Sequence, residues 1–278
     1  MSWFVPKTRE SPQGGNAAPQ ETAPRAHIRT LAEMPAAIYA VGDVHGMRAL
    51  YQELEARIVE DAATAGINGP KLIVLLGDLI DRGPDSAGLI DDLIAPAPTG
   101  FQCLVLRGNH DDKMRDFIAN PGQHREWLGY GGDATLASYG LKPDPIHGFN
   151  LSPRKLENMV RSAIPETHAR FLENLPYGLR VGDYFFCHAG INPETPITAQ
   201  NPDALLWGDP ERIDKAAGSL PVIVHGHIAI DDILITSRRI NVDTGAYASG
   251  KLSAVRLQAN ATPFGLSAGE STRRQAEV

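Results

Sequence analysis

The sequence lacks the features that would place it in a membrane or in an oxidising compartment. None of its apolar runs reaches the roughly eighteen residues that a membrane-spanning helix needs. It has only two cysteines, Cys103 and Cys187, and no CxxC pair, so a disulfide framework gets no support. No basic segment followed by an apolar one opens the chain, so no secretory signal is expected. We therefore expect a cytoplasmic protein without a membrane partner, its two thiols buried and free.

An excess of basic residues is also missing. The chain has 26 Lys and Arg against 33 Asp and Glu, a formal net charge of −7 at pH 7. Nucleic-acid backbones bind to basic surfaces, so no nucleic-acid partner is expected. A small phosphorylated substrate remains compatible with this charge, because bound cations would dominate the local field of a site.

The ends of the chain differ in composition from its middle. Residues 1–30 are rich in Pro, Gly, Ala, Gln and Ser and show no periodicity, which predicts a disordered N-terminal tail. Residues 259–278 have the same character and predict a flexible C-terminal tail. Residues 36–258 are expected to form one α/β domain. Within it, the stretch 111–180 has helix-like pieces and no clear strand, which predicts a helical cap inserted into the core.

Strand-like apolar runs alternate with helix-like stretches through the first part of that domain. Strand, polar turn and helix follow one another three times, with strands expected at 37–41, 72–76 and 103–106, which is typical of α/β layering. Helices are expected from Leu50 to Val59, where apolar residues recur at helical spacing, and from Ser86 to Ile94. Later apolar runs predict a second sheet, with strands at 184–187, 222–224, 233–236, 239–242 and 252–257.

Polar side chains follow five of these strands almost at once. Ligands in open α/β sheets bind beyond the carboxyl ends of the strands, so these side chains are expected to share one site. Oxygen and imidazole ligands suit Mn, Fe, Zn or Mg. A single Asp-x-His turn is more often an ordinary turn, but five such turns in succession predict a metal centre. The residues are Asp43 and His45; Asp78, Asp81 and Arg82; Asn109 and His110; His188; and His225 and His227.

The motifs that hold these residues resemble those of the metallophosphoesterase superfamily. They are GDVHG (42–46), GDLIDRG (77–83), GNHD (108–111), HAG (188–190) and GH (226–227), in this order. More narrowly, they resemble the phosphoprotein phosphatase family in its bacterial and phage branch, and symmetrical diadenosine tetraphosphate hydrolases share them. The resemblance implies a four-layer α/β/β/α sandwich with a two-metal site at one edge.

The resemblance also implies a role for each residue. Asp43 and His45 would bind the first metal ion, Asp78 would bridge both, and Asn109, His188 and His227 would bind the second. Asp81 would orient His110, the general acid, while Arg82 and Asn109 would hold phosphate oxygens. These roles are chemically reasonable, because one carboxylate can reach two cations about 3.5–4 Å apart, and a metal-bound hydroxide can attack phosphorus. A His held by a carboxylate can protonate the leaving oxygen.

Two positions depart from the pattern. Ala229 stands where the broader superfamily has a second His after the GH motif, which favours the narrower family. Asp209 stands where the bacterial branch has a further phosphate-binding Arg, and Arg212 is the candidate to replace it.

Other interpretations of single residues stay open at this point. Arg82 could pair with Asp81 or Asp85 on a solvated turn, and Asp81 could cap the helix that follows it. His225 is expected to support the site rather than bind a metal. Tyr247 could line the pocket or only pack against it.

Three functions are compatible with these residues. The first is a protein phosphatase acting on phosphoserine or phosphothreonine, with phosphotyrosine as a further option. It would use two divalent metal ions, for which Mn is preferred to Fe, Zn or Mg. The second is a dinucleoside polyphosphate hydrolase, in which Trp127, Tyr130 and Tyr139 could stack on a base. The third is a metal-binding scaffold without activity, which the presence of His110 and Asp81 argues against. Partners are expected to be a phosphorylated protein or a small phosphoester.

Overall fold

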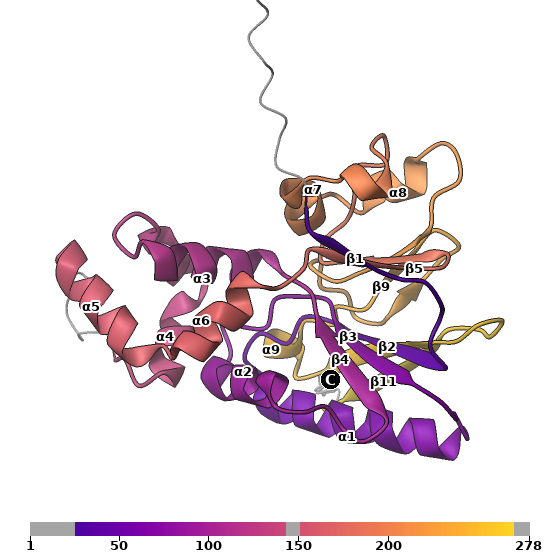
Figure 1. Cartoon of the computed structure of the whole chain (residues 1–278), viewed down its shortest axis with the longest axis horizontal. Coiled ribbons are helices and arrows are strands. Elements are labelled where there is room, and N and C mark those ends of the chain that lie inside the picture. Colours follow the sequence, from indigo (N-terminus) through magenta and orange to yellow (C-terminus); the bar gives the residue numbers. More distant parts are fainter. Residues whose placement is uncertain (1–25, 143–150, 270–278) are drawn as a thin grey trace, which may run out of the picture.

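Two β-sheets lie face to face with helices on their outer sides, in a computed structural model that describes residues 26–142 and 151–269 (Figure 1). The first sheet has the order β11 (Phe264–Ala268), β10 (Leu252–Leu257), β2 (Ala37–Val41), β3 (Lys71–Leu75) and β4 (Phe101–Val105). The second has the order β1 (Ile28–Leu31), β5 (Gly178–Val181), β6 (Tyr184–Cys187), β7 (Val222–His225), β9 (Arg239–Asn241) and β8 (Leu234–Ile235).

Helices α1 (Arg48–Thr64) and α2 (Ser86–Ile94) cover the outer face of the first sheet, and α7 (Pro202–Trp207) and α8 (Glu211–Lys215) cover that of the second (Figure 1). A helical lobe between β4 and β5 contains α3 (Asn109–Ala119), the 3-10 helix η1 (Arg125–Tyr130), α4 (Gly132–Ser138), α5 (Pro153–Ala163) and α6 (Glu166–Glu173). Two short elements complete the chain, the 3-10 helix η2 (Ile197–Ala199) and α9 (Ala246–Ser249). The predicted four-layer α/β/β/α architecture with a helical insertion is therefore confirmed.

Strand β2 shows why a central strand of this fold is apolar along its whole length. Tyr39 packs with the core under α1, whereas Ile38 and Ala40 pack with the core between the two sheets. Successive side chains of a strand point to opposite faces, so a strand buried on both faces needs apolar residues at every position. Strands β2, β3 and β4 run parallel, which brings their carboxyl ends to one edge of the sheet.

Three segments differ from the sequence-based expectations. Strand β10 pairs antiparallel with β2, so it belongs to the first sheet and not to the second. Strand β11 pairs with β10, so the prediction of a flexible tail from residue 259 is wrong for Phe264–Ala268. Strand β1 pairs with β5, so the predicted N-terminal tail ends before Ile28, and the rest of that tail up to residue 25 lies outside the described residues. Short strands at a sheet edge carry little periodicity, which is why the pattern missed them.

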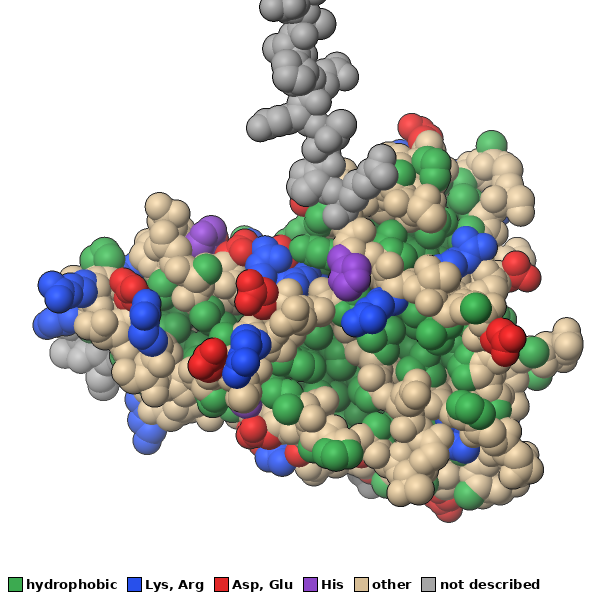
Figure 2. All heavy atoms as spheres, viewed as in Figure 1, with side chains coloured by type: hydrophobic (Ala, Val, Ile, Leu, Met, Phe, Trp, Pro, Cys, Tyr) green, Lys and Arg blue, Asp and Glu red, His purple; other side chains and the backbone are tan. Residues whose placement is uncertain are grey.

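The surface of the protein varies in character over the face that Figure 2 shows. Hydrophobic side chains gather where β4 and the neighbouring helices of the helical lobe lie in Figure 1. Charged side chains are more frequent toward the outer end of that lobe. No helix in the described part of the chain is long and apolar enough to cross a membrane.

Candidate metal centre

The loops that follow five strands converge on one cluster of polar side chains. Asp43 and His45 follow β2, Asp78 follows β3, and Asn109 opens α3 after β4. From the second sheet, His188 follows β6 and His227 follows β7. All of these except His227 are at most 4% exposed, so the cluster is sheltered from bulk water on most sides.

Asp78 stands at the centre of this cluster. One carboxylate oxygen, Oδ2, lies 3.6 Å from His45 Nε2 and 3.9 Å from His110 Nε2. The other oxygen, Oδ1, lies 3.5 Å from His188 Nε2. Two groups of possible metal ligands result, His45 with Asp78 and His110, and Asp78 with His188 and His227, each with its ligand atoms within 4.8 Å of one another. Because Asp78 belongs to both groups, it can bridge two cations.

The amide oxygen of Asn109 lies next to the second group. His188 Nε2 lies 2.7 Å from Asn109 Oδ1 and 3.0 Å from His227 Nδ1. The backbone N–H of His227 donates to both oxygens of Asp43, at 3.2 Å each. Five of the six predicted metal ligands thus share direct contacts around Asp78, and Asp43 joins the cluster through the loop that carries His227.

Backbone carbonyl groups fix the orientation of two of the histidines. His45 Nδ1 lies 2.8 Å from the carbonyl oxygen of Ile80, and His188 Nδ1 lies 3.0 Å from that of Leu76. A carbonyl oxygen can only accept, so in each ring Nδ1 carries the proton and donates it. The Nε2 lone pair is then free to face Asp78, which is the usual arrangement of a metal-binding histidine. Burial also lowers the pKa of His45 and of His227 to about 4, which keeps both rings neutral and able to bind a metal.

Three buried carboxylates in this cluster would repel one another without a cation. Burial, and then the charges of Asp243 and Asp78, raise the pKa of Asp43 well above its usual range. Burial raises the pKa of Asp243 to about 6. Burial also opposes ionisation of Asp78, yet the neighbouring histidines lower the pKa of that carboxyl overall. Carboxylate, amide and neutral imidazole ligands around buried acidic groups fit two divalent cations.

The backbone of the cluster is strained where its side chains are presented. Six non-glycine residues in the described ranges have positive φ, and five of them belong to the predicted site. A residue in this conformation costs about 1–3 kcal/mol, and such residues gather at functional sites. Their φ angles are 46° for His45, 50° for Asp78, 74° for Asp81, 68° for Arg82 and 71° for His227.

Asp81 forms a buried pair with His110, which also belongs to the first group of possible metal ligands. His110 Nδ1 donates to Asp81 Oδ2 at 2.6 Å. Asp81 also accepts from Trp127 Nε1 at 2.8 Å and from Thr135 Oγ1 at 2.7 Å. Burial lowers the pKa of His110, but the carboxylates of Asp78 and Asp81 outweigh it and raise that pKa above its ordinary value. Its Nε2 is directed toward Asp78, with the two atoms 3.9 Å apart.

The structure resolves the other interpretations of this loop. Asp85, and not Asp81, caps α2 by accepting from the backbone N–H of Gly88. Arg82 does not pair with Asp85, which instead pairs with Arg48.

The guanidinium of Arg82 lies within the cluster. Its Nη1 is 2.8 Å from His45 Nε2 and its Nη2 is 3.1 Å from His110 Nε2. The guanidinium carbon also lies 4.5 Å from the ring centroid of Tyr247, which is exposed and lines the site. His225 stays outside the cluster, as expected, with its Nδ1 3.0 Å from the carbonyl oxygen of Gly226.

Arg212 is not in the site, and the expectation that it completes a phosphate clamp is wrong. It lies on α8, over the outer face of the second sheet, and its Nη2 is 3.8 Å from Glu194. Ile213, the next residue, packs into the core beneath that helix and fixes its orientation. Three residues beyond the expected position, the chain has already turned away from the strand ends.

Asp111 is a site residue that sequence reasoning missed. Its buried carboxylate accepts from the backbone N–H groups of Asp78 at 3.0 Å, Leu79 at 3.1 Å and Gly108 at 2.8 Å. It therefore joins the loops after β3 and β4, which carry Asp78 and Asn109. Its sequence signals were its place at the end of the GNHD motif, to which no role was given, and an acidic residue in the first turn of a helix, which is a common feature.

Replacing Asp111 with Asn is expected to destabilise the protein by about 1–3 kcal/mol, because an NH₂ group would face the N–H of Leu79 and leave it unpaired. Metal affinity should fall by about 10–100-fold, as for other groups that orient metal ligands. Urea unfolding and metal titration would measure both effects. The matched control is Asp116→Asn on the same helix, where the carboxylate pairs with the side chain of Arg115. Equal unfolding midpoints for the two variants would contradict this role of Asp111.

Three exposed aromatic rings surround the mouth of the cluster. Tyr247 packs edge-on against His45 at a centroid distance of 5.2 Å, and Tyr130 against His110 at 6.4 Å. Trp207 packs in the same way against His227 at 5.9 Å. Each ring is 44–49% exposed. Of the aromatic residues proposed for base stacking, Trp127 is fully buried and Tyr139 bonds to His168, so only Tyr130 lies at this rim.

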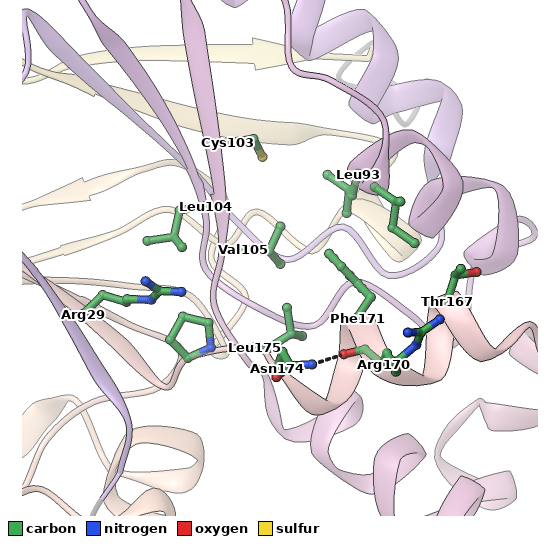
Figure 3. A pocket seen from close by; sticks show the side chains of 12 residues that line it. Arg29, Leu93, Cys103, Leu104, Val105, Thr167, Arg170, Phe171, Asn174 and Leu175 are labelled. Carbon is green, nitrogen blue, oxygen red and sulfur yellow. Dashed lines mark hydrogen bonds between the residues drawn. The ribbon is translucent and has the colours of Figure 1, made fainter.

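A separate hollow of about 540 Å³ lies between β4 and α6, away from this cluster (Figure 3). Its walls are largely apolar, with Leu93, Cys103 and Phe171 among them, and Arg29 and Arg170 stand at its sides. None of the metal-site residues lines it.

Known proteins share this sequence pattern and fold. The family model described as calcineurin-like phosphoesterase matches residues 36–261. The asymmetrical bis(5'-nucleosyl)-tetraphosphatase PrpE of Bacillus thuringiensis (strain Al Hakam) is 25% identical over 234 residues, which cover 78% of this chain and 88% of that protein. Serine/threonine-protein phosphatase 2 of Escherichia coli (strain K12) is 26% identical over 233 residues, which cover 80% of this chain and 93% of that protein. A crystal structure provisionally named a diadenosine tetraphosphatase has a TM-score of 0.59 at 21% identity. The match covers 87% of this chain and 98% of that chain, which supports the fold.

Proposed function

Because the chain belongs to the calcineurin-like phosphoesterase family, we propose that it hydrolyses phosphoesters with two divalent metal ions held around Asp78. The observation that carries this proposal is the position of Asp78 between two ligand groups, with the His110–Asp81 pair beside it. A binding scaffold would need the ligands but not a histidine held by a buried carboxylate, so this pair counts against the scaffold hypothesis.

The residues that we propose to hold the ions are the ones that the family resemblance implies. Asp43, His45 and Asp78 would hold one, and Asp78, Asn109, His188 and His227 the other. Mn²⁺ is our choice for activity in vitro because of the family resemblance, since the oxygen and imidazole ligands alone do not separate Mn from Fe, Zn or Mg. When bound, such ions supply positive charge for the phosphoryl oxygens and make a water molecule more acidic.

The side chains of this chain would carry the remaining chemistry. Arg82 presents a planar pair of N–H groups to two phosphoryl oxygens, and the ring of Tyr247 supports its guanidinium. As the oxygen of water bonds to phosphorus and the ester bond breaks, His110 Nε2 would give its proton to the leaving oxygen. Asp81 would stabilise the protonated ring through Nδ1 and fix its orientation.

The first candidate substrate is a protein that carries phosphoserine or phosphothreonine. The similarity to the E. coli serine/threonine-protein phosphatase supports it, because the match covers 93% of that enzyme. A monoester needs only the reacting phosphoryl group at the metal site, with Arg82 on its oxygens and His110 at the leaving oxygen.

A second candidate, a dinucleoside polyphosphate, is favoured by the aromatic rim. Exposed rings stack readily on bases, with about 1–3 kcal/mol per base where this has been measured by substitution. Tyr130, Trp207 and Tyr247 are exposed and surround the site, and the PrpE relatives are named for nucleotide substrates.

A side-by-side turnover assay would separate the two candidates. Metal-free protein reloaded with Mn²⁺ would be given phosphoserine, phosphothreonine and phosphotyrosine peptides and diadenosine tetraphosphate. We expect the highest kcat/KM on the phosphoserine and phosphothreonine peptides and none in Asp78→Asn. Preferred cleavage of the dinucleotide, weakened in Trp207→Ala, would replace the first candidate with the second. No turnover of any phosphoester by the reloaded protein would reject the proposed function.

A further inference from the structure

We propose that Lys113 binds a second anionic group of the substrate, beside the phosphoryl group that is cleaved. The inference rests on the proposed function, because it concerns how the same site selects its substrate. It starts from a cation near the mouth of the site that the mechanism above does not use.

Lys113 projects from the same helix as the proposed acid. It follows His110 by three residues on α3, a spacing that places both side chains on one side of the helix. Its ammonium nitrogen lies 4.9 Å from the ring centroid of Tyr130 and 5.6 Å from that of Trp207. Attraction between a cation and two ring faces holds the ammonium between them.

The two rings that flank Lys113 also border the site. Tyr130 packs against His110, and Trp207 against His227. The ammonium therefore lies between Tyr130, from the helical lobe, and Trp207, at the end of α7. Because Lys113 contacts these rings, and the rings in turn contact His110 and His227, we place the ammonium next to the reacting phosphoryl group.

Lys113 differs from the other cations of its neighbourhood in having no acidic partner. Arg107 pairs with Asp112, and Arg115 pairs with Asp112 and Asp116. Within the ranges that the structure describes, no carboxylate forms an ion pair with Lys113, whose contacts are the two rings. Ring faces accept no conventional hydrogen bond, so the three N–H donors of the ammonium remain available for a ligand.

Charge explains why that ligand would be an anion. With two divalent ions in the site, an ammonium at the mouth is repelled unless a negative group lies between them. Arg82 occupies the opposite side, over Tyr247 and next to His45, and serves the reacting phosphoryl group. The site thus has one cation for the phosphate that is cleaved and another for a phosphate or carboxylate beside it.

Calorimetric binding to the Mn²⁺-loaded protein tests this without turnover. The probes are orthophosphate, with one anionic group, and imidodiphosphate, with two. In Lys113→Met, which keeps a long unbranched side chain, we expect the Kd of imidodiphosphate to rise about tenfold, the loss of one charge-assisted hydrogen bond. The Kd of orthophosphate should change less than about twofold by the same reasoning. Lys113→Arg should retain most of the affinity for imidodiphosphate. Lys215→Met, on the distant α8, should bind both probes with the Kd values of the wild type. Equal changes for both probes, or none for either, would overturn the proposal.

Kinetics on the same variants identify the source of the second anion. The substrates are a phosphoserine peptide with Glu beside the phosphoserine, its Gln counterpart, and diadenosine tetraphosphate. Because Lys113 binds a group that does not react, KM should rise about tenfold in Lys113→Met while kcat stays constant. A rise with the Glu peptide but not with the Gln peptide identifies a carboxylate, and a rise with the tetraphosphate identifies a phosphate. An unchanged KM for all three substrates would refute the proposal even if the wild type hydrolyses them.

Discussion

Replacing Asp78 with Asn is expected to remove detectable phosphoesterase activity and to release the metal ions. Both ligand groups contain Asp78, so the substitution weakens two sites at once. The amide offers only one oxygen, and its NH₂ group would face a cation or a histidine nitrogen. Loss of a group that merely orients a ligand costs about 10–100-fold in metal affinity, so loss of the bridging ligand should cost more than about 100-fold.

Metal content after gel filtration, measured by elemental analysis, would check this result together with the turnover rate. The matched control is Asp183→Asn in the exposed turn between β5 and β6, which should leave both unchanged. A fully metal-loaded Asp78→Asn protein would show that the bridging role is wrong. Loss of metal with activity retained would show that hydrolysis does not depend on the bound metal ions.

Replacing His110 with Asn is expected to lower kcat by about 10²–10⁴-fold, the usual contribution of a general acid. The metal content should fall less than in Asp78→Asn, because His110 belongs to only one of the two ligand groups and Asp78, Asn109 and His188 remain. The loss should depend on the leaving group. An alkoxide from phosphoserine needs a proton, whereas p-nitrophenolate leaves without one. The fall in kcat should therefore be much smaller with p-nitrophenyl phosphate.

A circular dichroism melt would show whether this variant folds, since the substitution leaves the buried Asp81 without its histidine. Trp127 and Thr135 still donate to Asp81, which limits the damage. His124→Asn, in the loop before η1, is the control. An equal loss of kcat on both substrates would mean that His110 acts on the site as a whole and does not protonate the leaving group.

The sequence predicted the centre of the fold better than its edges. Strand β2 and the polar residues after it were predictable because a strand buried on both faces is apolar throughout and a ligand turn interrupts it abruptly. Strands β1 and β11 were not, since they lie at sheet edges, where half-exposed residues such as Arg29 and Phe264 give no alternation. The sheet to which β10 belongs depends on long-range pairing, which local periodicity does not encode.

For the candidate site, the predicted residues that came from strand ends are the ones that the structure gathers. Arg212 failed because its assignment rested on distance along the chain, and a short helix turned it outward. Asp111 and Lys113 were missed for a different reason. Each acts through three-dimensional neighbours, three backbone N–H groups in one case and two aromatic rings in the other, that no short motif brings together.

The five strained residues of the metal centre influence which substitutions this protein can accept during evolution. Glycine at any of these positions would relieve the backbone strain, since glycine adopts positive φ without steric cost. It would also remove buried hydrogen bonds, such as those that Asp81 accepts from Trp127 and Thr135. A requirement for a relaxed backbone alone would therefore favour glycine at His45, Asp78, Asp81, Arg82 and His227. A chain that keeps imidazole, carboxylate and guanidinium groups there retains a less stable fold in exchange for reactivity. Thermostabilising such a protein is consequently safer at positions outside these loops.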